Sequence, residues 1–301
     1  MAEMTPMMRQ SLEMKEKHPD SILFFRLGDF YEMFNEDAKL ASKELDLTLT
    51  TRDRSKPEEE RTPMCGVPYH SCDSYIARLI AKGYKVAICE QMEDPALAKG
   101  LVERDITRII TPGTVIAASM LEEGKNNFLC AIYADSAAYG LCLCDISTGE
   151  VFATSLSAAE DAMDHLKNEL GRFHPTEVIL SDGAWQLEGL VDFLRERLDC
   201  LCENGGEARF RYDVSLSAVK KQFTAGLDTL PEGDTAAVQA AGGLLSYLYE
   251  TQKTDLSHIS EFSYYTAGQY LELDLTARQT LELTATMRAQ EKKGSLLWVL
   301  D

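Results

Sequence analysis

An apolar run, a glycine turn and an aromatic-rich run near the N-terminus constrain the fold of this chain more than any other segment. Residues 22–25 (Ile-Leu-Phe-Phe) precede the pair Gly28-Asp29, and residues 30–34 (Phe-Tyr-Glu-Met-Phe) follow it. Because glycine adopts a positive φ without a steric clash, this pair predicts a two-residue turn between antiparallel strands. We therefore expect a β-hairpin with an exposed tip.

The second strand of this hairpin combines an aromatic ring with a carboxylate. Side chains alternate along a strand, so Phe30 and Glu32 point the same way, about 6.6 Å apart at roughly 3.3 Å per residue. A flat ring beside a carboxylate suits the insertion of a wedge into a base stack. In the alternative interpretation Phe30 and Phe34 belong to the core and Glu32 lies at its rim, which is usual for strand aromatics.

The run Gly28-Asp29-Phe30-Tyr31-Glu32 resembles the Phe-x-Glu mismatch-reading motif of the MutS family of DNA mismatch repair proteins. Six other blocks resemble the same family in the same order, which makes the resemblance specific. They are residues 5–8 (Thr-Pro-Met-Met), 63–70 (Pro-Met-Cys-Gly-Val-Pro-Tyr-His), 86–91 (Val-Ala-Ile-Cys-Glu-Gln), 108–114 (Arg-Ile-Ile-Thr-Pro-Gly-Thr), 143–149 (Leu-Cys-Asp-Ile-Ser-Thr-Gly) and 277–283 (Ala-Arg-Gln-Thr-Leu-Glu-Leu).

The resemblance implies a mixed α/β (α+β) chain that is a fragment of a longer protein. Residues 1–115 would form a mixed-sheet mismatch-recognition domain, MutS domain I, and residues 116–126 a linker. Residues 127–255 would form the connector domain, MutS domain II, with a ribonuclease H-like fold. Residues 256–301 would begin the mostly helical core and lever domain, MutS domain III, and be cut within it.

The resemblance also implies a function. Phe30 would insert at a mispaired or unpaired base and Glu32 would hydrogen-bond that base, either protonated or as an acceptor of a base N–H, with Arg52 and Met64 as secondary DNA contacts. The expected partners are double-stranded DNA with mismatches or small insertion or deletion loops, MutL, and a second copy in a full-length homodimer. The connector domain would transmit the signal to the ATPase and to MutL.

A phosphate-binding loop of the form Gly-x-x-x-x-Gly-Lys-Ser/Thr does not occur in the sequence. This chain is therefore expected to be a binding segment, not an enzyme, with no cofactor and no metal site of its own. ATP and Mg²⁺ are expected only for the ATPase domain of the full-length family protein, which is a DNA-dependent ATPase.

The charge argues against strong DNA binding by this chain alone. The formal net charge is −19, whereas DNA-binding surfaces are usually basic. Residues 1–115 carry 16 Lys and Arg against 20 Asp and Glu, a net charge of −4, and the remaining residues carry −15. Most of the acidity therefore lies outside the proposed DNA-reading part, whose own grip on DNA should be weak.

The chain has the features of a reduced cytoplasmic protein. Residues 1–11 lack a basic segment followed by an apolar one, and no apolar stretch approaches about 18 residues, so neither a signal peptide nor a membrane span is predicted. The cysteines lack zinc-site spacing, and most lie in apolar, strand-like contexts. They are Cys65, Cys72, Cys89, Cys130, Cys142, Cys144, Cys200 and Cys202.

Residue patterns predict alternating helices and strands. Thr5-Pro6 is typical of a helix start, because Thr can cap a helix and Pro is tolerated at its first position. The predicted helices are residues 5–17, 37–44, 70–81, 158–170, 185–198, 212–223, 236–251 and 275–289. The predicted strands besides the hairpin are residues 46–51, 84–91, 107–111, 127–134, 139–146, 150–155, 177–180 and 270–273, with a charged loop at residues 52–61.

Two other function classes remain open. Nucleases of the ribonuclease H-like fold need a carboxylate in the middle of the first strand to hold metal ions. Residues 128–133 contain none, and Asp135 and Asp145 fall at strand ends. A MutS-like protein acting on recombination structures would lack the Phe30-x-Glu32 wedge. His70 has no nucleophile or metal partner at a telling spacing and is interpreted as structural.

Overall fold

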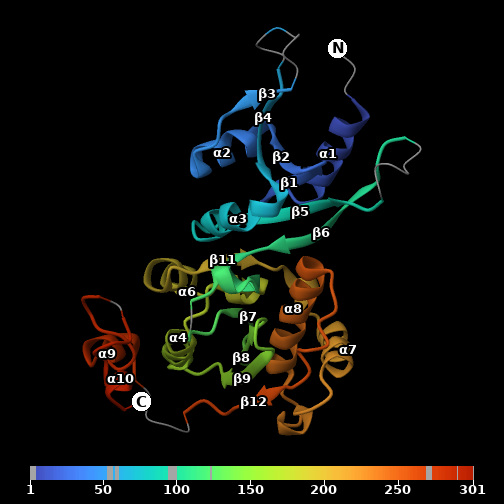
Figure 1. The fold of residues 1–301 in the computed structure, drawn as a ribbon. Coiled ribbons are helices and arrows are strands. Elements are labelled where there is room, and N and C mark those ends of the chain that lie inside the picture. The colour runs from blue at the N-terminus through green and yellow to red at the C-terminus, as the bar shows by residue number, and fades with distance from the viewer. Residues whose placement is uncertain are drawn as a thin grey trace. The chain divides into compact units, whose positions relative to one another are not determined.

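The structure of the protein is a computed structural model that describes residues 5–52, 57, 61–93, 100–122, 124–268, 273–289 and 291–300. The chain divides into two compact units, residues 1–123 with 248–255, and residues 124–247 with 256–301. Within the described residues, each unit contains a six-stranded sheet with helices beside it (Figure 1). The predicted mixed α/β class is therefore confirmed.

The sheet of the first unit has the strand order β3-β4-β2-β1-β5-β6, in which only β1 and β5 pair in parallel among the described strands. Its elements are α1 (Pro6–Lys17), β1 (Ser21–Leu27), β2 (Phe30–Phe34), α2 (Asn35–Leu45), β3 (Thr50–Thr51), β4 (Pro63–Pro68), η2 (Tyr69–Ser71), α3 (Cys72–Ile80), β5 (Lys85–Gln91), β6 (Arg104–Ile110), η3 (Pro112–Thr114) and η4 (Ala118–Met120). Apolar side chains of α2 and α3 pack on one face of the sheet, and those of α1 pack on the other.

Helix α1 begins as its sequence predicts, because the Thr5 hydroxyl accepts a hydrogen bond from the Met8 amide at 3.3 Å and Pro6 is the first helical residue. The helix is fixed to the sheet through Asp37 of α2. The Asp37 carboxylate accepts hydrogen bonds from Lys15 Nζ of α1 and from the Leu23 amide of β1, each at 2.9 Å. This nearly buried carboxylate thus joins three elements.

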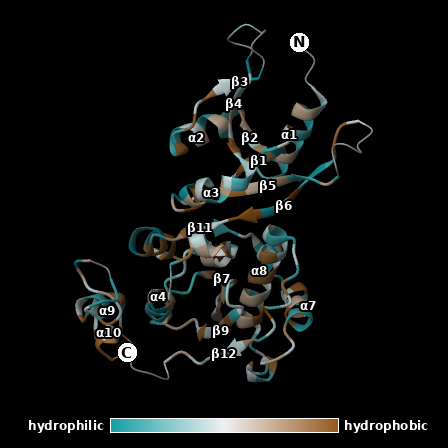
Figure 2. Ribbon diagram, in the orientation of Figure 1, coloured by the Kyte–Doolittle hydropathy of each residue, from teal (hydrophilic) through white to brown (hydrophobic). Residues whose placement is uncertain are grey.

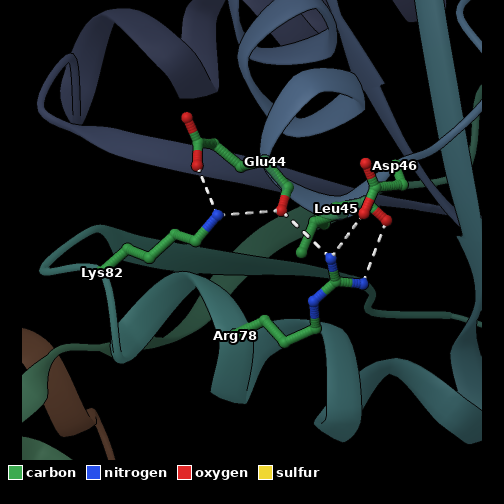
Figure 3. Close-up of polar contacts among 5 residues, drawn as sticks. All are labelled: Glu44, Leu45, Asp46, Arg78 and Lys82. Carbon is green, nitrogen blue, oxygen red and sulfur yellow. Dashed lines mark hydrogen bonds and ion pairs between the residues drawn. The ribbon is translucent and has the colours of Figure 1, made fainter.

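Two cations of α3 and the turn after it hold the C-terminal end of α2 (Figure 3). Arg78 donates hydrogen bonds to the Leu45 carbonyl and to the Asp46 carboxylate, both at 3.1 Å. Lys82 donates to the Glu44 carboxylate at 2.6 Å. Positive charge near a helix C-terminus complements the helix dipole, so these contacts stabilise the end of α2 on its face of the sheet.

The strand predicted at residues 46–51 is mostly wrong, because only Thr50–Thr51 pair with β4. Asp46 adopts a left-handed conformation with φ +57°, and the Leu47 amide bonds back to the Ser42 carbonyl. These residues therefore complete the helix end instead of joining the sheet.

The sheet of the second unit has the order β11-β10-β7-β8-β9-β12. The elements of this unit are β7 (Phe128–Ala134), β8 (Ala138–Asp145), β9 (Glu150–Ser157), α4 (Ala162–Phe173), β10 (Glu177–Leu180), α5 (Asp182–Trp185), α6 (Leu190–Asp192), η5 (Phe193–Arg197), β11 (Leu201–Asn204), η6 (Glu207–Phe210), α7 (Tyr212–Gln222), η7 (Leu227–Thr229), α8 (Thr235–Gln252), β12 (Ser263–Tyr264), α9 (Leu275–Thr280) and α10 (Leu296–Leu300). The last residues of α8, from residue 248 on, belong to the first unit. As predicted, three antiparallel strands precede the α/β crossovers, because β10 and β11 extend the sheet in parallel.

Two predicted helices are wrong in extent. The helix at residues 185–198 is interrupted, because Gly189 adopts φ +72° between α5 and α6. The helix at residues 275–289 stops at Thr280, and Leu281 remains 57% exposed. A helix gains most of its stability by burying an apolar face, which this segment does not do. Most of the strand predicted at residues 270–273 lies outside the described residues. Helix α10 is hydrophobic (Figure 2), and its side chains are likewise exposed.

The cysteines behave as small hydrophobic residues, as predicted. All eight thiols are free, and six of them are buried. Burial raises the pKa of the Cys65 thiol to about 11 and that of Cys89 to about 12, so both are protonated at neutral pH. Among the described residues, no helix combines the length and apolarity needed to cross a membrane.

Candidate nucleic-acid interface

The predicted hairpin is present in the first unit. Leu27 of β1 pairs directly with Phe30 of β2, which leaves Gly28 and Asp29 as the turn, and Gly28 has φ +58°. An L-residue rarely adopts this conformation, which explains why a glycine stands there. The Asp29 carbonyl accepts a hydrogen bond from the Tyr69 amide at 2.9 Å and so ties the tip to the end of β4.

Arg26 braces the same tip from the face of the sheet that carries α2 and α3. Its guanidinium lies 3.6 Å from the ring centroid of Tyr69 and 5.5 Å from that of Tyr31. Its Nε donates a hydrogen bond to the Gly28 carbonyl at 2.5 Å, and the Tyr31 hydroxyl donates one to Glu90. Stacking and hydrogen bonds therefore restrain the turn, although sequence reasoning assigned no role to Arg26 or Tyr69.

The opposite face carries Phe30, Glu32 and Phe34, since Tyr31 and Met33 point into the core beneath α2 and α3. Helix α1 covers Phe34, which is 7% exposed and packs against Phe25. Phe30 is 48% exposed. The interpretation of Phe30 as a core residue is therefore wrong, because the helix that buries Phe34 does not cover the tip.

Glu32 lies between the exposed and the buried aromatic residue and is itself partly enclosed. Its carboxylate accepts a hydrogen bond from Arg52 at 2.7 Å, and its side chain is 18% exposed. Burial raises the pKa of the Glu32 carboxyl, and the Arg52 guanidinium opposes that rise. Glu32 is paired with Gly66 of β4, where an added Cβ would lie 3.2 Å from the Tyr31 carbonyl oxygen and 3.5 Å from Glu32 Cγ. Glycine at this position thus avoids a tight contact with the backbone of β2.

The two secondary DNA-contact candidates, Arg52 and Met64, lie in different surroundings. Arg52 follows β3 and contacts Glu32 directly, whereas Met64 on β4 is paired with Phe34 and packs partly against the cluster beneath α1. Of the loop predicted at residues 52–61, residues 53–56 and 58–60 lie outside the described residues. Gly66 was not singled out from the sequence, although a glycine inside a strand can indicate a close approach.

The second unit gives no support to nuclease chemistry. Every residue of β7 is buried, and Asp135 and Asp145 near its ends are used in turns. Asp145 accepts hydrogen bonds from the Asn127 and Ser147 amides, and Asp135 accepts them from the Ala137 and Ala138 amides. Among the described residues, no group of three or more His, Cys, Asp or Glu side chains could hold a metal ion.

The fold and the site define a mixed α/β protein with two six-stranded sheets, one of which presents the exposed Phe30 ring beside the Glu32 carboxyl group. Family comparison matches residues 5–119 to MutS domain I and residues 127–260 to MutS domain II. The chain therefore belongs to the MutS family.

Individual relatives agree with this assignment. The chain is 49% identical over 303 residues to the DNA mismatch repair protein MutS of Acetivibrio thermocellus, and 48% identical over 301 residues to that of Ruminiclostridium cellulolyticum. Each alignment covers 100% of this chain and 34% of the relative. The chain thus spans about a third of the length of the curated relatives it matches.

Proposed function

We propose that this chain reads mispaired or unpaired bases in duplex DNA during mismatch repair, with Phe30 as the wedge and Glu32 as its polar partner. The observation that supports this role is the exposed Phe30 ring beside Glu32 on a braced hairpin tip. Phe30 inserts from the minor groove and stacks on the affected base, and Glu32 hydrogen-bonds that base. The relatives named above are DNA mismatch repair proteins, which fits this chemistry.

Energetics explain how such a wedge discriminates. Stacking on an aromatic ring contributes roughly 1–3 kcal/mol per base, whereas unstacking and kinking a duplex costs a few kcal/mol per step. A mismatched base has already lost part of its pairing and stacking energy, so the wedge enters there at lower cost. Phe30 therefore senses local deformability instead of a base sequence.

We propose that the second unit acts as a connector that transmits the state of the DNA to the ATPase of the full-length protein and to MutL. A homodimer would place one Phe30 at the mismatch. Because residues 1–115 carry a net charge of −4, firm DNA binding requires surfaces outside these residues.

The proposed function is tested by fluorescence anisotropy of a labelled duplex with one G·T mispair and of its perfect match, at fixed salt, with this segment in its complete natural chain. We expect about tenfold tighter binding to the mispair, which corresponds to about 1.4 kcal/mol and lies within the range of one stacking contact. A 2-aminopurine beside the mispair should also brighten as it unstacks. Equal affinities for the two duplexes would refute the proposal.

Glu32 should act in its protonated form, because a neutral carboxyl group is not repelled by phosphates and can donate a hydrogen bond to the base. Burial already raises its pKa, and the negative field of DNA raises it further. Mismatch affinity should then fall as pH rises through the pKa of the complex. Glu32→Gln, which keeps a donor, should bind the mispair at least as tightly and without this pH dependence. Weaker binding by Glu32→Gln at every pH tested would instead mean that Glu32 acts as an ionised acceptor.

A further inference from the structure

The ion pair between Glu32 and Arg52 occupies the carboxyl group that the proposed function needs. Arg52 lies beyond β3, whose neighbour is β4, and β4 in turn pairs with β2, which carries Glu32. Arg52 Nη1 nevertheless contacts Glu32 Oε2, two strands away in the sheet order. Residues 20 positions apart in sequence thus meet at 2.7 Å.

The two partners differ in exposure. The Arg52 side chain is 45% exposed, whereas that of Glu32 is 18% exposed and held on the strand. Arginine presents a planar set of donors that fits a carboxylate or a phosphate equally well. The Arg52 guanidinium is therefore the partner that can move, whereas Glu32 stays in place on β2.

We propose that Arg52 exchanges partners: it binds the Glu32 carboxylate in the absence of DNA and moves to a backbone phosphate when a duplex binds. This inference rests on the proposed function of Phe30 and Glu32. The ion pair cancels the negative charge of Glu32 during the approach to DNA. When Arg52 moves to the phosphate, the Glu32 carboxyl loses its counter-ion. The carboxyl then takes up a proton and hydrogen-bonds the base beside Phe30.

The test is a double-mutant cycle of Arg52→Met and Glu32→Gln in the complete natural chain, with binding to the matched duplex measured over a range of salt. Arg52→Met should reduce the slope of the logarithm of the binding constant against the logarithm of the salt concentration by an amount that corresponds to about one phosphate contact. In wild type Arg52 must leave Glu32 to reach the phosphate, whereas in Glu32→Gln it has no carboxylate to leave. Arg52→Met should therefore weaken binding by different factors in the wild-type and Glu32→Gln backgrounds, because only in wild type does Arg52 exchange a carboxylate for a phosphate.

Arg78→Met is the matched control. The Arg78 side chain is 46% exposed and pairs with Asp46 at 3.1 Å (Figure 3). Arg78 belongs to α3, which packs on the face of the sheet opposite Phe30. The control removes the same charge and an ion pair, together with the hydrogen bonds that Arg78 donates to the end of α2. We expect it to leave the salt dependence unchanged and to show no coupling with Glu32→Gln. Arg52→Lys, which keeps the charge, should retain the salt dependence of wild type.

Two results would overturn the exchange: a salt dependence that Arg52→Met does not alter, or equal effects of Arg52→Met in both backgrounds. Thermal melts show whether each variant is folded. If Arg52→Met is unfolded, Arg52→Lys is used instead, and a loss of wild-type salt dependence in that variant would contradict the exchange. Failure of the proposed function is distinguishable, because it would appear as an unchanged mismatch preference in Phe30→Ala. The cycle on matched DNA does not depend on that preference.

Discussion

Phe30→Ala should abolish the preference for mispaired DNA while leaving the fold intact. Loss of one stacking contact worth roughly 1–3 kcal/mol lowers mismatch affinity by about 5-fold to 150-fold. Binding to matched DNA should change little, because the wedge does not enter an intact stack. Since Phe30 is 48% exposed, we expect its removal to change the free energy of unfolding by less than about 1 kcal/mol.

Phe34→Ala provides the matched control on the same strand and the same face. Phe34 is 7% exposed and packs against Phe25 beneath α1, so its truncation should lower the free energy of unfolding by about 3–5 kcal/mol. Urea denaturation measures stability, and anisotropy measures mismatch preference. If Phe30→Ala destabilised the protein as strongly as Phe34→Ala, the ring would be a core residue and the wedge would be refuted.

Gly140→Ala should destabilise the second unit by about 3 kcal/mol, near the upper end for overpacking. An added Cβ at this position of β8 would lie 2.0 Å from the Ala236 carbonyl oxygen at the start of α8. Because the contact is with backbone, no side-chain rotation can relieve it. Either α8 must move away from β8 or the sheet must distort.

Gly171→Ala is the control for this substitution, because it lies inside helix α4 and its added Cβ would lie 3.5 Å from Leu275, an ordinary contact. Alanine is the better helix former, so this variant should be more stable by up to about 1 kcal/mol. Thermal melts compare the two changes. A Gly140→Ala protein that melts like wild type would contradict the close approach of α8 to β8.

The sequence predicted the elements whose signals lie within a few residues. Thr5-Pro6 marked the start of α1, Gly28-Asp29 marked the hairpin turn, and the apolar run at residues 128–134 marked a strand, now seen to be fully buried. It missed β11 (Leu201–Asn204), which is short and exists through its parallel pairing with β10. It also overextended helices whose apolar faces find no partner, as after Thr280.

For the candidate site, the sequence by itself determined which groups are present and their order along β2: a ring at Phe30, a carboxyl at Glu32 and a turn that permits a tip, because alternation and glycine chemistry are local. Only the tertiary structure decided that α1 covers Phe34 and not Phe30, and that Arg52 meets Glu32 across β4. Burial and ion pairing depend on which strands and helices become neighbours. Which elements become neighbours is decided by contacts between residues far apart in the chain, and no local sequence pattern encodes those contacts.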